Sequence, residues 1–169
     1  MAALGDVLLV LLGGGPGTAH DLQQRHAATL GPDHVVDVTR VASTLSRLER
    51  HGDVQSGPMP GRPKQLRFAL TEAGDRKQRT WMLGLPADAT PEEIRTRVLL
   101  AVEATDRSTF EMVVAVCLTR LEVGRRQAVP AHRGRAITAE TARAELAEAS
   151  ATAQLAWLRQ LSARHRERD

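Results

Sequence analysis

The side chains best suited to chemistry lie between residues 38 and 74, where arginines alternate with small hydroxyl side chains. The segment VTRVASTLSRLERHG carries Thr39, Arg40, Ser43, Arg47 and Arg50, and the segment GPMPGRPKQLRFAL carries Arg62 and Lys64. A guanidinium can bond phosphates or take O6 and N7 of one guanine together, and hydroxyl groups bond either phosphates or bases. This mixture of cations and short donors indicates contact with double-stranded DNA.

A helix beginning after Asp37 would carry these side chains on one face. Asp37 is a good N-cap, and apolar residues recur behind it at three- and four-residue intervals. The residues expected to turn inward are Val38, Val41, Leu45 and Leu48. The arginines and hydroxyl side chains then face outward, although a solvated amphipathic helix of any function would share this pattern.

The preceding helix supplies the first half of a helix-turn-helix motif. Thr18 can cap it, and Asp21 stands three residues later, as in a capping box. Gly31-Pro32 closes the helix and leaves a short turn before Asp37. In motifs of this kind the second helix enters the major groove.

Two short extended pieces follow, near residues 54–55 and 65–70, with Gly-Pro and Pro-Gly turn signals between them. They predict a β-hairpin with Arg62 and Lys64 at its tip. Beside the helix at 38–50 such a hairpin is a wing, whose cations can reach phosphates or the minor groove. Taken alone, the GRPK segment is also compatible with a polar surface turn.

The rest of the chain indicates a mainly α fold. Aromatic residues make up 2% of the 169 residues and Tyr is absent, so Leu, Val and Ala must build the core, which favours helices. Further helices are expected at residues 3–12 and 71–83, from Pro91, from Ser108 to Gly124, and from Thr138 to Arg164. In the last helix the expected inner line is Ala142, Leu146, Ala149, Ala153, Trp157 and Leu161.

The segment LGLPADAT at 83–90 has the composition of a linker and divides the chain into two parts. We expect a winged helix-turn-helix DNA-binding domain at 1–84 and an α-helical domain at 85–169 for dimerisation and effector binding. Net charge is +3 overall, whereas residues 34–82 hold nine Lys/Arg against five Asp/Glu, which is +4 locally. The positive charge is therefore concentrated in the first part.

Several other classes of protein are disfavoured. The histidines show no metal-ligand spacing, no catalytic triad or carboxylate pair stands out, and Cys117 falls among core positions. GGGPG at 13–17 departs from the dinucleotide-binding fingerprint because Thr18 stands where the third glycine belongs. We therefore expect no enzyme, metal or cofactor. The single cysteine and the lack of an apolar run of roughly 20 residues predict a cytoplasmic protein without a membrane span.

Two further features have open interpretations. Trp81 and Trp157 are the large amphipathic aromatics and could stack a small aromatic effector, although ordinary packing is the simpler interpretation. The loop at 125–135 holds four arginines and no acid, and could touch DNA or be solvated.

In combination, LGGGPGTAHDL, VTRVASTLSRLERHGDV, GRPKQLRFALTEAG and the following Trp81 resemble the winged helix of PadR-type transcriptional regulators, over about residues 4–83. The resemblance places Arg40, Ser43, Thr44 and Arg47 on the recognition helix and Arg62 and Lys64 on the wing. The chain departs from the family at two positions where Tyr is common, which here are His20 and Ala42.

The resemblance implies a dimeric bacterial repressor with a helical dimerisation part and a small aromatic or drug-like effector. Two recognition helices would then enter successive major grooves of a pseudo-palindromic operator. The alternative is a winged-helix module that binds a protein partner instead of a specific DNA sequence.

Overall fold

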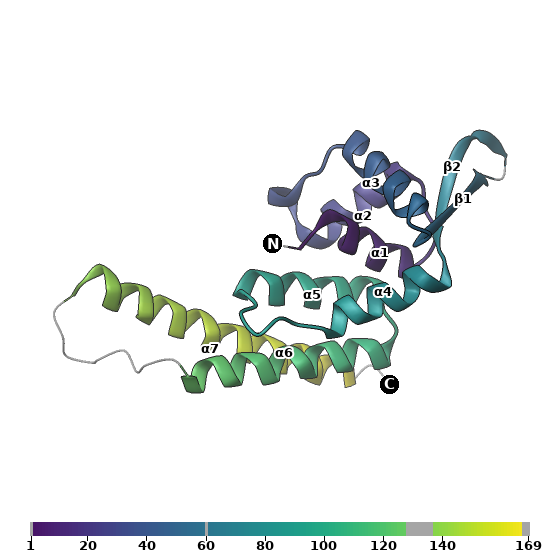
Figure 1. The fold of residues 1–169 in the computed structure, drawn as a ribbon. Coiled ribbons are helices and arrows are strands. Elements are labelled where there is room, and N and C mark those ends of the chain that lie inside the picture. The colour runs from purple at the N-terminus through teal and green to yellow at the C-terminus, as the bar shows by residue number, and fades with distance from the viewer. Residues whose placement is uncertain (1, 60, 128–136, 167–169) are drawn as a thin grey trace.

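The computed structural model describes residues 2–59, 61–127 and 137–166, with side chains except those of Pro63, Lys64 and Arg166. Its elements are α1 (Leu4–Gly13), α2 (Ala19–Leu30), the 3-10 helix η1 (Pro32–His34), α3 (Val38–Arg50), β1 (Val54–Met59), β2 (Arg62–Leu70), α4 (Glu72–Leu83), α5 (Pro91–Ala104), α6 (Arg107–Gln127) and α7 (Ala139–Arg166). The protein is a mainly α winged helix-turn-helix with a helical C-terminal part, as the sequence predicted. The hairpin projects from the end that holds α1 to α4, α5 packs on the other side of α1, and α6 and α7 lie beyond α5 (Figure 1).

Local capping explains where several helices begin. Thr18 Oγ1 accepts a hydrogen bond from the Asp21 amide at 3.2 Å, and the Asp21 carboxylate accepts one from the Thr18 amide at 2.9 Å. Thr90 and Glu93 form the same capping box at the start of α5. These reciprocal bonds satisfy amides that the first helical turn leaves unpaired, so both predicted starts are confirmed.

Helix α1 is the centre of the core. Every residue from Val7 to Leu12 is at most 3% exposed, and α1 contacts α2, α3, α4 and α5. A helix that is apolar all round has to be enclosed, which explains the LLVLL run of the sequence. One cluster of buried side chains therefore runs from the winged helix into the C-terminal helices.

The hairpin is held to the core at its base. β1 and β2 are antiparallel with Val54 opposite Leu70, and the register shifts between Pro58 and Met59. Phe68 is 5% exposed, and its backbone exchanges two hydrogen bonds with Gly17, at 2.9 and 3.0 Å. The base is thus fixed while the tip extends beyond the helices.

The TEAG segment packs tightly under the hairpin. Thr71 caps α4 through the Gly74 amide and donates a hydrogen bond to the Gly52 carbonyl at 2.6 Å. A Cβ on Gly74 would stand 1.9 Å from the Asp53 carbonyl oxygen, a distance that no side chain tolerates. Glycine is required here because two backbone segments meet.

The C-terminal helices differ from the sequence expectations in three places. The cap of α6 lies two residues earlier than predicted: the Asp106 carboxylate accepts the Thr109 amide at 2.9 Å, so Asp106 takes the capping place expected of Ser108 and the helix begins at Arg107. The helix also continues through Gly124 to Gln127, since a single glycine costs a helix only about 1 kcal/mol. On α5 the spacing of the sequence predicts Ile94, Val98 and Leu99 inward; Ile94 and Val98 are buried, but Leu99 is half-buried and Leu100 is fully buried in its place.

The predicted inner line of α7 is wrong for the single chain. Its first four members, Ala142, Leu146, Ala149 and Ala153, are exposed, and Leu146 is 68% exposed. The buried residues are Leu155 and Leu158, with Trp157 and Leu161 half-buried beside them. Only the second half of α7 packs on α5 and α6, while its first half extends past the end of α5 (Figure 1).

The described residues hold neither a membrane-spanning helix nor a cluster of metal ligands. No helix in these ranges combines the length and apolar character needed to cross a membrane. Nor do the described His, Cys, Asp and Glu side chains come together in a group of three that could hold a metal ion.

Candidate nucleic-acid interface

The outer face of α3 is the main candidate surface. Thr39, Arg40, Ser43, Arg47 and Arg50 are all exposed. Behind them Val41 and Leu45 are fully buried and Leu48 is 5% exposed, so the predicted amphipathic helix is confirmed. Val38, expected to turn inward, is 37% exposed, because it belongs to the first turn, where α3 leaves the core.

The start of α3 is fixed on both sides. The Asp37 carboxylate accepts the Thr39 amide at 2.7 Å, and this bond lowers the pKa of Asp37 below its ordinary value. The Gln23 side chain of α2 donates to the Val36 carbonyl at 3.1 Å. Side-chain hydrogen bonds therefore hold the turn between the two helices at Val36 and Asp37.

Thr44 does not belong to this surface. It is 8% exposed, and its hydroxyl donates to the Arg40 carbonyl at 2.8 Å. Threonine on the border of a helix can satisfy its hydroxyl in this way and pack its methyl inward. The structure thus removes Thr44 from the DNA-contacting set that the resemblance implied.

The arginines of α3 differ from the cations of α4 in their lack of acidic partners. Within the described residues, Arg40, Arg47 and Arg50 form no ion pair. On α4, by contrast, Arg76 pairs with Glu72, Arg79 with Asp75, and Lys77 with Asp53. The charge of α4 is largely balanced locally, whereas the charge of α3 remains available to an external anion.

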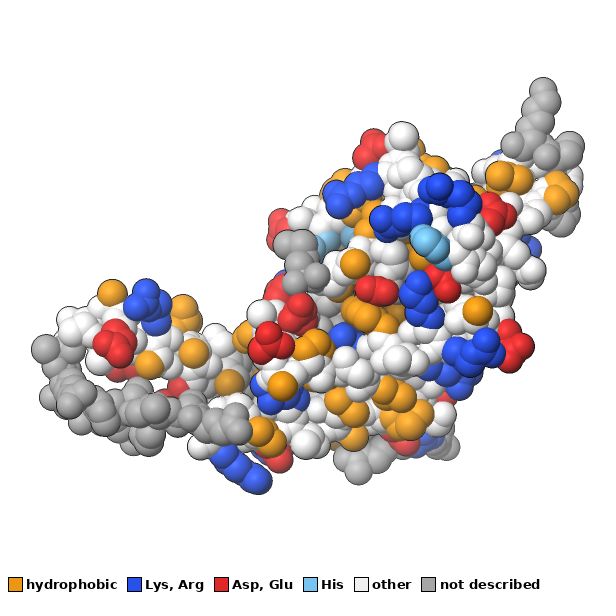
Figure 2. Space-filling view, viewed as in Figure 1, with side chains coloured by type: hydrophobic (Ala, Val, Ile, Leu, Met, Phe, Trp, Pro, Cys, Tyr) orange, Lys and Arg blue, Asp and Glu red, His pale blue; other side chains and the backbone are white. Residues whose placement is uncertain are grey.

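The space-filling view agrees with this distribution. Lys and Arg side chains gather on the upper part of the molecule, over the region of α2 and α3 (Figure 2). Arg47 lies across α1, where its Nη2 is 3.8 Å from the position that a Cβ on Gly5 would take. A small residue at Gly5 leaves room for this guanidinium.

The wing supplies further cations. Arg62 is exposed at the start of β2. Lys64 lies on β2, but its side chain is outside the described part, so the predicted approach of Lys64 to the same surface stays a prediction. Arg67, which counted toward the local charge but was not a candidate contact, is exposed and bonds the Pro16 carbonyl at 3.5 Å.

A residue that sequence reasoning did not assign to the site connects its two parts. Glu49 accepts hydrogen bonds from the hydroxyl of Ser56 at 2.6 Å and from its amide at 3.0 Å. Glu49 is near the end of α3 and Ser56 is on β1, so this pair orients the wing relative to the helix. The sequence signal was an acid on the apolar side of an otherwise basic helix.

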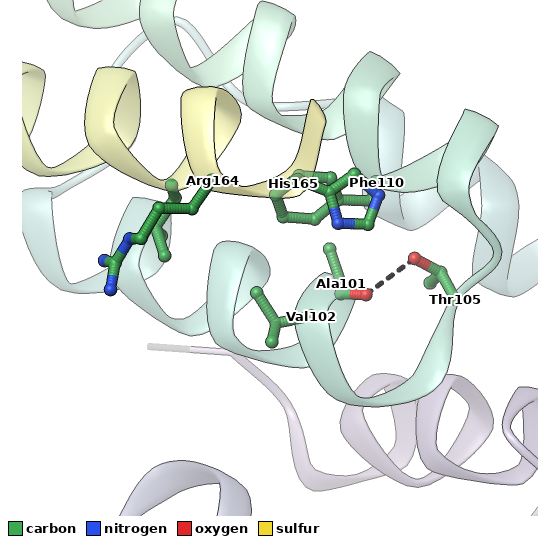
Figure 3. Close-up of a pocket in the computed structure, with 7 residues that line it drawn as sticks. Ala101, Val102, Thr105, Phe110, Arg164 and His165 are labelled. Carbon is green, nitrogen blue, oxygen red and sulfur yellow. Dashed lines mark hydrogen bonds between the residues drawn. The ribbon is translucent and has the colours of Figure 1, made fainter. Parts of the chain in front are cut away.

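The two tryptophans predicted to bind an effector do not line a described cavity. Trp81 is covered by the Arg97 guanidinium, whose carbon lies 4.1 Å from the ring centroid, and Trp157 is half-buried on α7. The cavity of about 540 Å³ between α5, α6 and α7, for example, is lined by other residues, which include Phe110 and His165 (Figure 3). An effector role for the two tryptophans stays a prediction.

Cys117 is inaccessible for thiolate chemistry. Its side chain is 1% exposed, and burial raises the pKa of the thiol to about 11. The basic loop predicted at 125–135 lies mostly outside the described residues, which end at Gln127 and resume at residue 137.

Solved structures of other proteins have similar folds. The fold is similar to that of Bacillus subtilis PadR in a crystal structure with operator DNA, with a TM-score of 0.45 and 14% sequence identity. The match covers 96% of this chain and 98% of that chain. No family model matches the sequence. No curated protein matches it either.

Proposed function

We propose that this chain is a PadR-like transcriptional regulator that binds DNA as a two-fold dimer. The observation that carries the proposal is the outer face of α3, where exposed arginines without acidic partners stand beside hydroxyl side chains. Such a face can contact phosphates and base edges when the helix lies in the major groove. The proposed contacts are Thr39, Arg40, Ser43, Arg47, Arg62 and Lys64.

The attachment of the wing to α3 supports this proposal. The bonds between Glu49 and Ser56 orient β1 against α3, so Arg62 at the tip can follow the DNA backbone while α3 occupies the groove. A wing that is already oriented in the free protein loses less conformational entropy when DNA binds.

The dimer rests on the first half of α7. Ala142, Leu146, Ala149 and Ala153 form a line of small and apolar side chains that a single chain leaves uncovered. A second copy would cover this line and place two recognition helices about 34–36 Å apart, one DNA turn, on a pseudo-palindromic operator. The regulator would act in the cytoplasm by occupying DNA, repress by steric exclusion, and be released by a small-molecule effector.

DNA binding is tested with fragments selected from random genomic DNA and measured by fluorescence anisotropy. Affinity should fall with log salt, at a slope near −0.9 for each phosphate contacted. Arg47→Ala should weaken binding about 5- to 150-fold, equivalent to roughly 1–3 kcal/mol, if Arg47 reads a base.

Two variants serve as matched controls. Arg76→Ala removes an exposed cation that Glu72 already pairs, and Thr44→Val changes a buried side chain of α3 itself. Both should bind within about twofold of the unaltered chain. A DNA affinity that changes neither with salt concentration nor in Arg47→Ala would contradict the proposal. That result would favour a module that binds a protein partner.

A further inference from the structure

Two arginines outside the proposed contact set converge on one backbone oxygen. Arg25 of α2 donates from Nη2 to the Pro16 carbonyl at 3.4 Å and from Nη1 to the Gly15 carbonyl at 2.8 Å. Arg67 of β2 donates from Nη2 to the same Pro16 carbonyl at 3.5 Å. The two guanidinium groups therefore meet at the loop between α1 and α2, although a helix and a distant strand supply them.

No carboxylate balances the charge of this pair. Within the described residues, neither Arg25 nor Arg67 forms an ion pair. Asp21 stands one turn before Arg25, at a spacing that allows an ion pair. Its carboxylate instead accepts the Thr18 amide at 2.9 Å, and the Thr18 bonds lower the pKa of Asp21 more than Arg25 does. Two like charges this close repel each other, and an anion bound by both would remove the repulsion.

Both groups have donors left for an external anion. Arg67 is exposed, and its partner across the hairpin is Gly57, which has no side chain to cover it. Arg25 is half-buried. A guanidinium has several N–H donors, of which Arg25 uses two and Arg67 one in the bonds to the loop. Phosphate oxygens accept such donors, and one phosphate group can bond both side chains at once.

The loop that orients the two arginines is itself fixed. The Gly17 amide donates to the Phe68 carbonyl at 3.0 Å, and the Gly17 carbonyl accepts the Phe68 amide at 2.9 Å. The Gly15 amide donates to the Leu12 carbonyl at 3.0 Å. The carbonyls of Gly15 and Pro16 are thus held in place and position the guanidinium groups before a ligand arrives. Less side-chain entropy is then lost on binding.

The pair lies at the edge of the wing that is opposite to α3. Gly17 pairs with one edge of β2, and β1 pairs with the other edge. β1 is also the strand that Glu49 of α3 bonds through Ser56. If α3 lies in the major groove and the wing follows the backbone, the phosphate next to the pair lies outside the base pairs that α3 contacts.

We propose that Arg25 and Arg67 together bind one phosphate of the DNA backbone, on the side of the wing away from α3. We call this pair the flanking clamp. The clamp rests on the proposed function, because the phosphate belongs to the DNA that α3 contacts. It adds a contact without base specificity, so flanking DNA of any sequence contributes to affinity.

The test uses the full chain with the selected DNA fragments and measures Kd by fluorescence anisotropy at several salt concentrations. In Arg25→Gln/Arg67→Gln, Kd should rise about five- to fiftyfold, the effect of charge-assisted hydrogen bonds. The magnitude of the salt slope should fall by about 0.9, the value for one phosphate. The loss should be equal on selected and on unrelated DNA, because a phosphate contact does not depend on sequence.

Two further variants show whether the loss is local. Arg79→Gln/Arg95→Gln removes two exposed cations that each have an acidic partner on their own helix, and Kd should stay within about twofold. Arg67→Gln alone removes an exposed side chain with a single long hydrogen bond, and it should raise Kd about threefold or more. If thermal unfolding shows that Arg25→Gln/Arg67→Gln does not fold, Arg67→Gln decides.

The bound phosphate is located with DNA that carries one uncharged methylphosphonate linkage at a time. With the unaltered chain, one linkage outside the base pairs whose identity affects binding should raise Kd about five- to fiftyfold. The same linkage should have no effect on Kd in Arg25→Gln/Arg67→Gln, since the clamp is already lost.

Three outcomes overturn the clamp. An unchanged salt slope in Arg25→Gln/Arg67→Gln, or a scan without such a linkage, overturns it and leaves the proposed function intact. Inorganic phosphate that gives saturable shifts of the Gly15 and Gly17 amides, while methylphosphonate has no effect, assigns the pair to a free anion instead. An unaltered chain that binds no DNA overturns the clamp and the proposed function together.

Discussion

The Glu49 carboxylate accepts two hydrogen bonds from Ser56, one from the hydroxyl at 2.6 Å and one from the amide at 3.0 Å. This pair joins the last turn of α3 to the first strand of the wing. The pair therefore links the two surfaces proposed to contact DNA, although neither Glu49 nor Ser56 would touch DNA.

Removing this connection should weaken DNA binding without removing a cation. Glu49→Ala and Ser56→Ala, combined in a double-mutant cycle, should give a coupling energy of about 1.5–3 kcal/mol in urea unfolding, because the acceptor is ionised. Each variant should also raise the Kd for DNA. Glu103→Gln, at an exposed acid of α5, is the control and should change neither value. Because Ser56→Ala keeps the backbone amide, additive effects of the two alanine substitutions would show that the bond from the Ser56 hydroxyl contributes nothing.

Two glycine substitutions should have opposite effects on stability. Gly74→Ala should destabilise by at least about 2 kcal/mol, since its Cβ would meet the Asp53 carbonyl oxygen at 1.9 Å. Gly124→Ala should stabilise by roughly 0.5–1 kcal/mol, since this helical glycine has no atom within 4 Å of its Cβ position. Thermal or urea unfolding of both variants measures the contrast, and a mild loss at Gly74 would mean that the two segments can separate.

His26 should make the fold sensitive to acid. Its pKa is lowered in the folded state by burial, so below about pH 6.5, the ordinary value, the unfolded chain binds a proton that the folded chain resists. Stability is then fully present above pH 6.5 and declines as pH falls toward the lower pKa of the folded state. In His26→Phe this part of the decline should vanish, and its unfolding free energy should match or exceed that of the unaltered chain at pH 5.5. If the unfolding free energies of the unaltered chain and of His26→Phe change with pH in parallel between pH 5 and 8, this prediction is wrong.

The exposed line on α7 predicts the behaviour of the chain in solution. Leu146→Glu places a charge at a side chain that is 68% exposed in the single chain, so folding of the single chain should be unaffected. If a second copy covers this line, the variant should sediment as a monomer at micromolar concentration while the unaltered chain is a dimer. Ala144→Glu introduces the same charge on the opposite side of the helix and should remain dimeric. An unaltered chain that is itself monomeric would overturn the dimer.

Features set by neighbouring residues were predictable from the sequence. The capping boxes of Thr18 with Asp21 and Thr90 with Glu93, and the alternating faces of α3, depend on contacts within one or two turns. The hairpin followed from its turn residues in the same way, although β1 reaches Met59, four residues beyond the expected piece.

Features set by distant contacts were not predictable. Thr44 lies at the border of the apolar face of α3, and only the packing of α1 decides that it is buried. On α7 an Ala-rich sequence offers several comparable faces, and α5 and α6 select the one with Leu155 and Leu158. The bond from Glu49 to Ser56 needed the hairpin to fold back onto α3, which spacing along the chain does not reveal.

Because α1 is enclosed on all sides, partly by α5, the winged part cannot be separated cleanly from the rest of the chain. A fragment ending at residue 84 would leave the α5 side of this leucine-rich helix facing water and would tend to self-associate. Heat or denaturant should accordingly unfold both parts in one transition. Because α1 belongs to both cores, a substitution that destabilises one part should also destabilise the other.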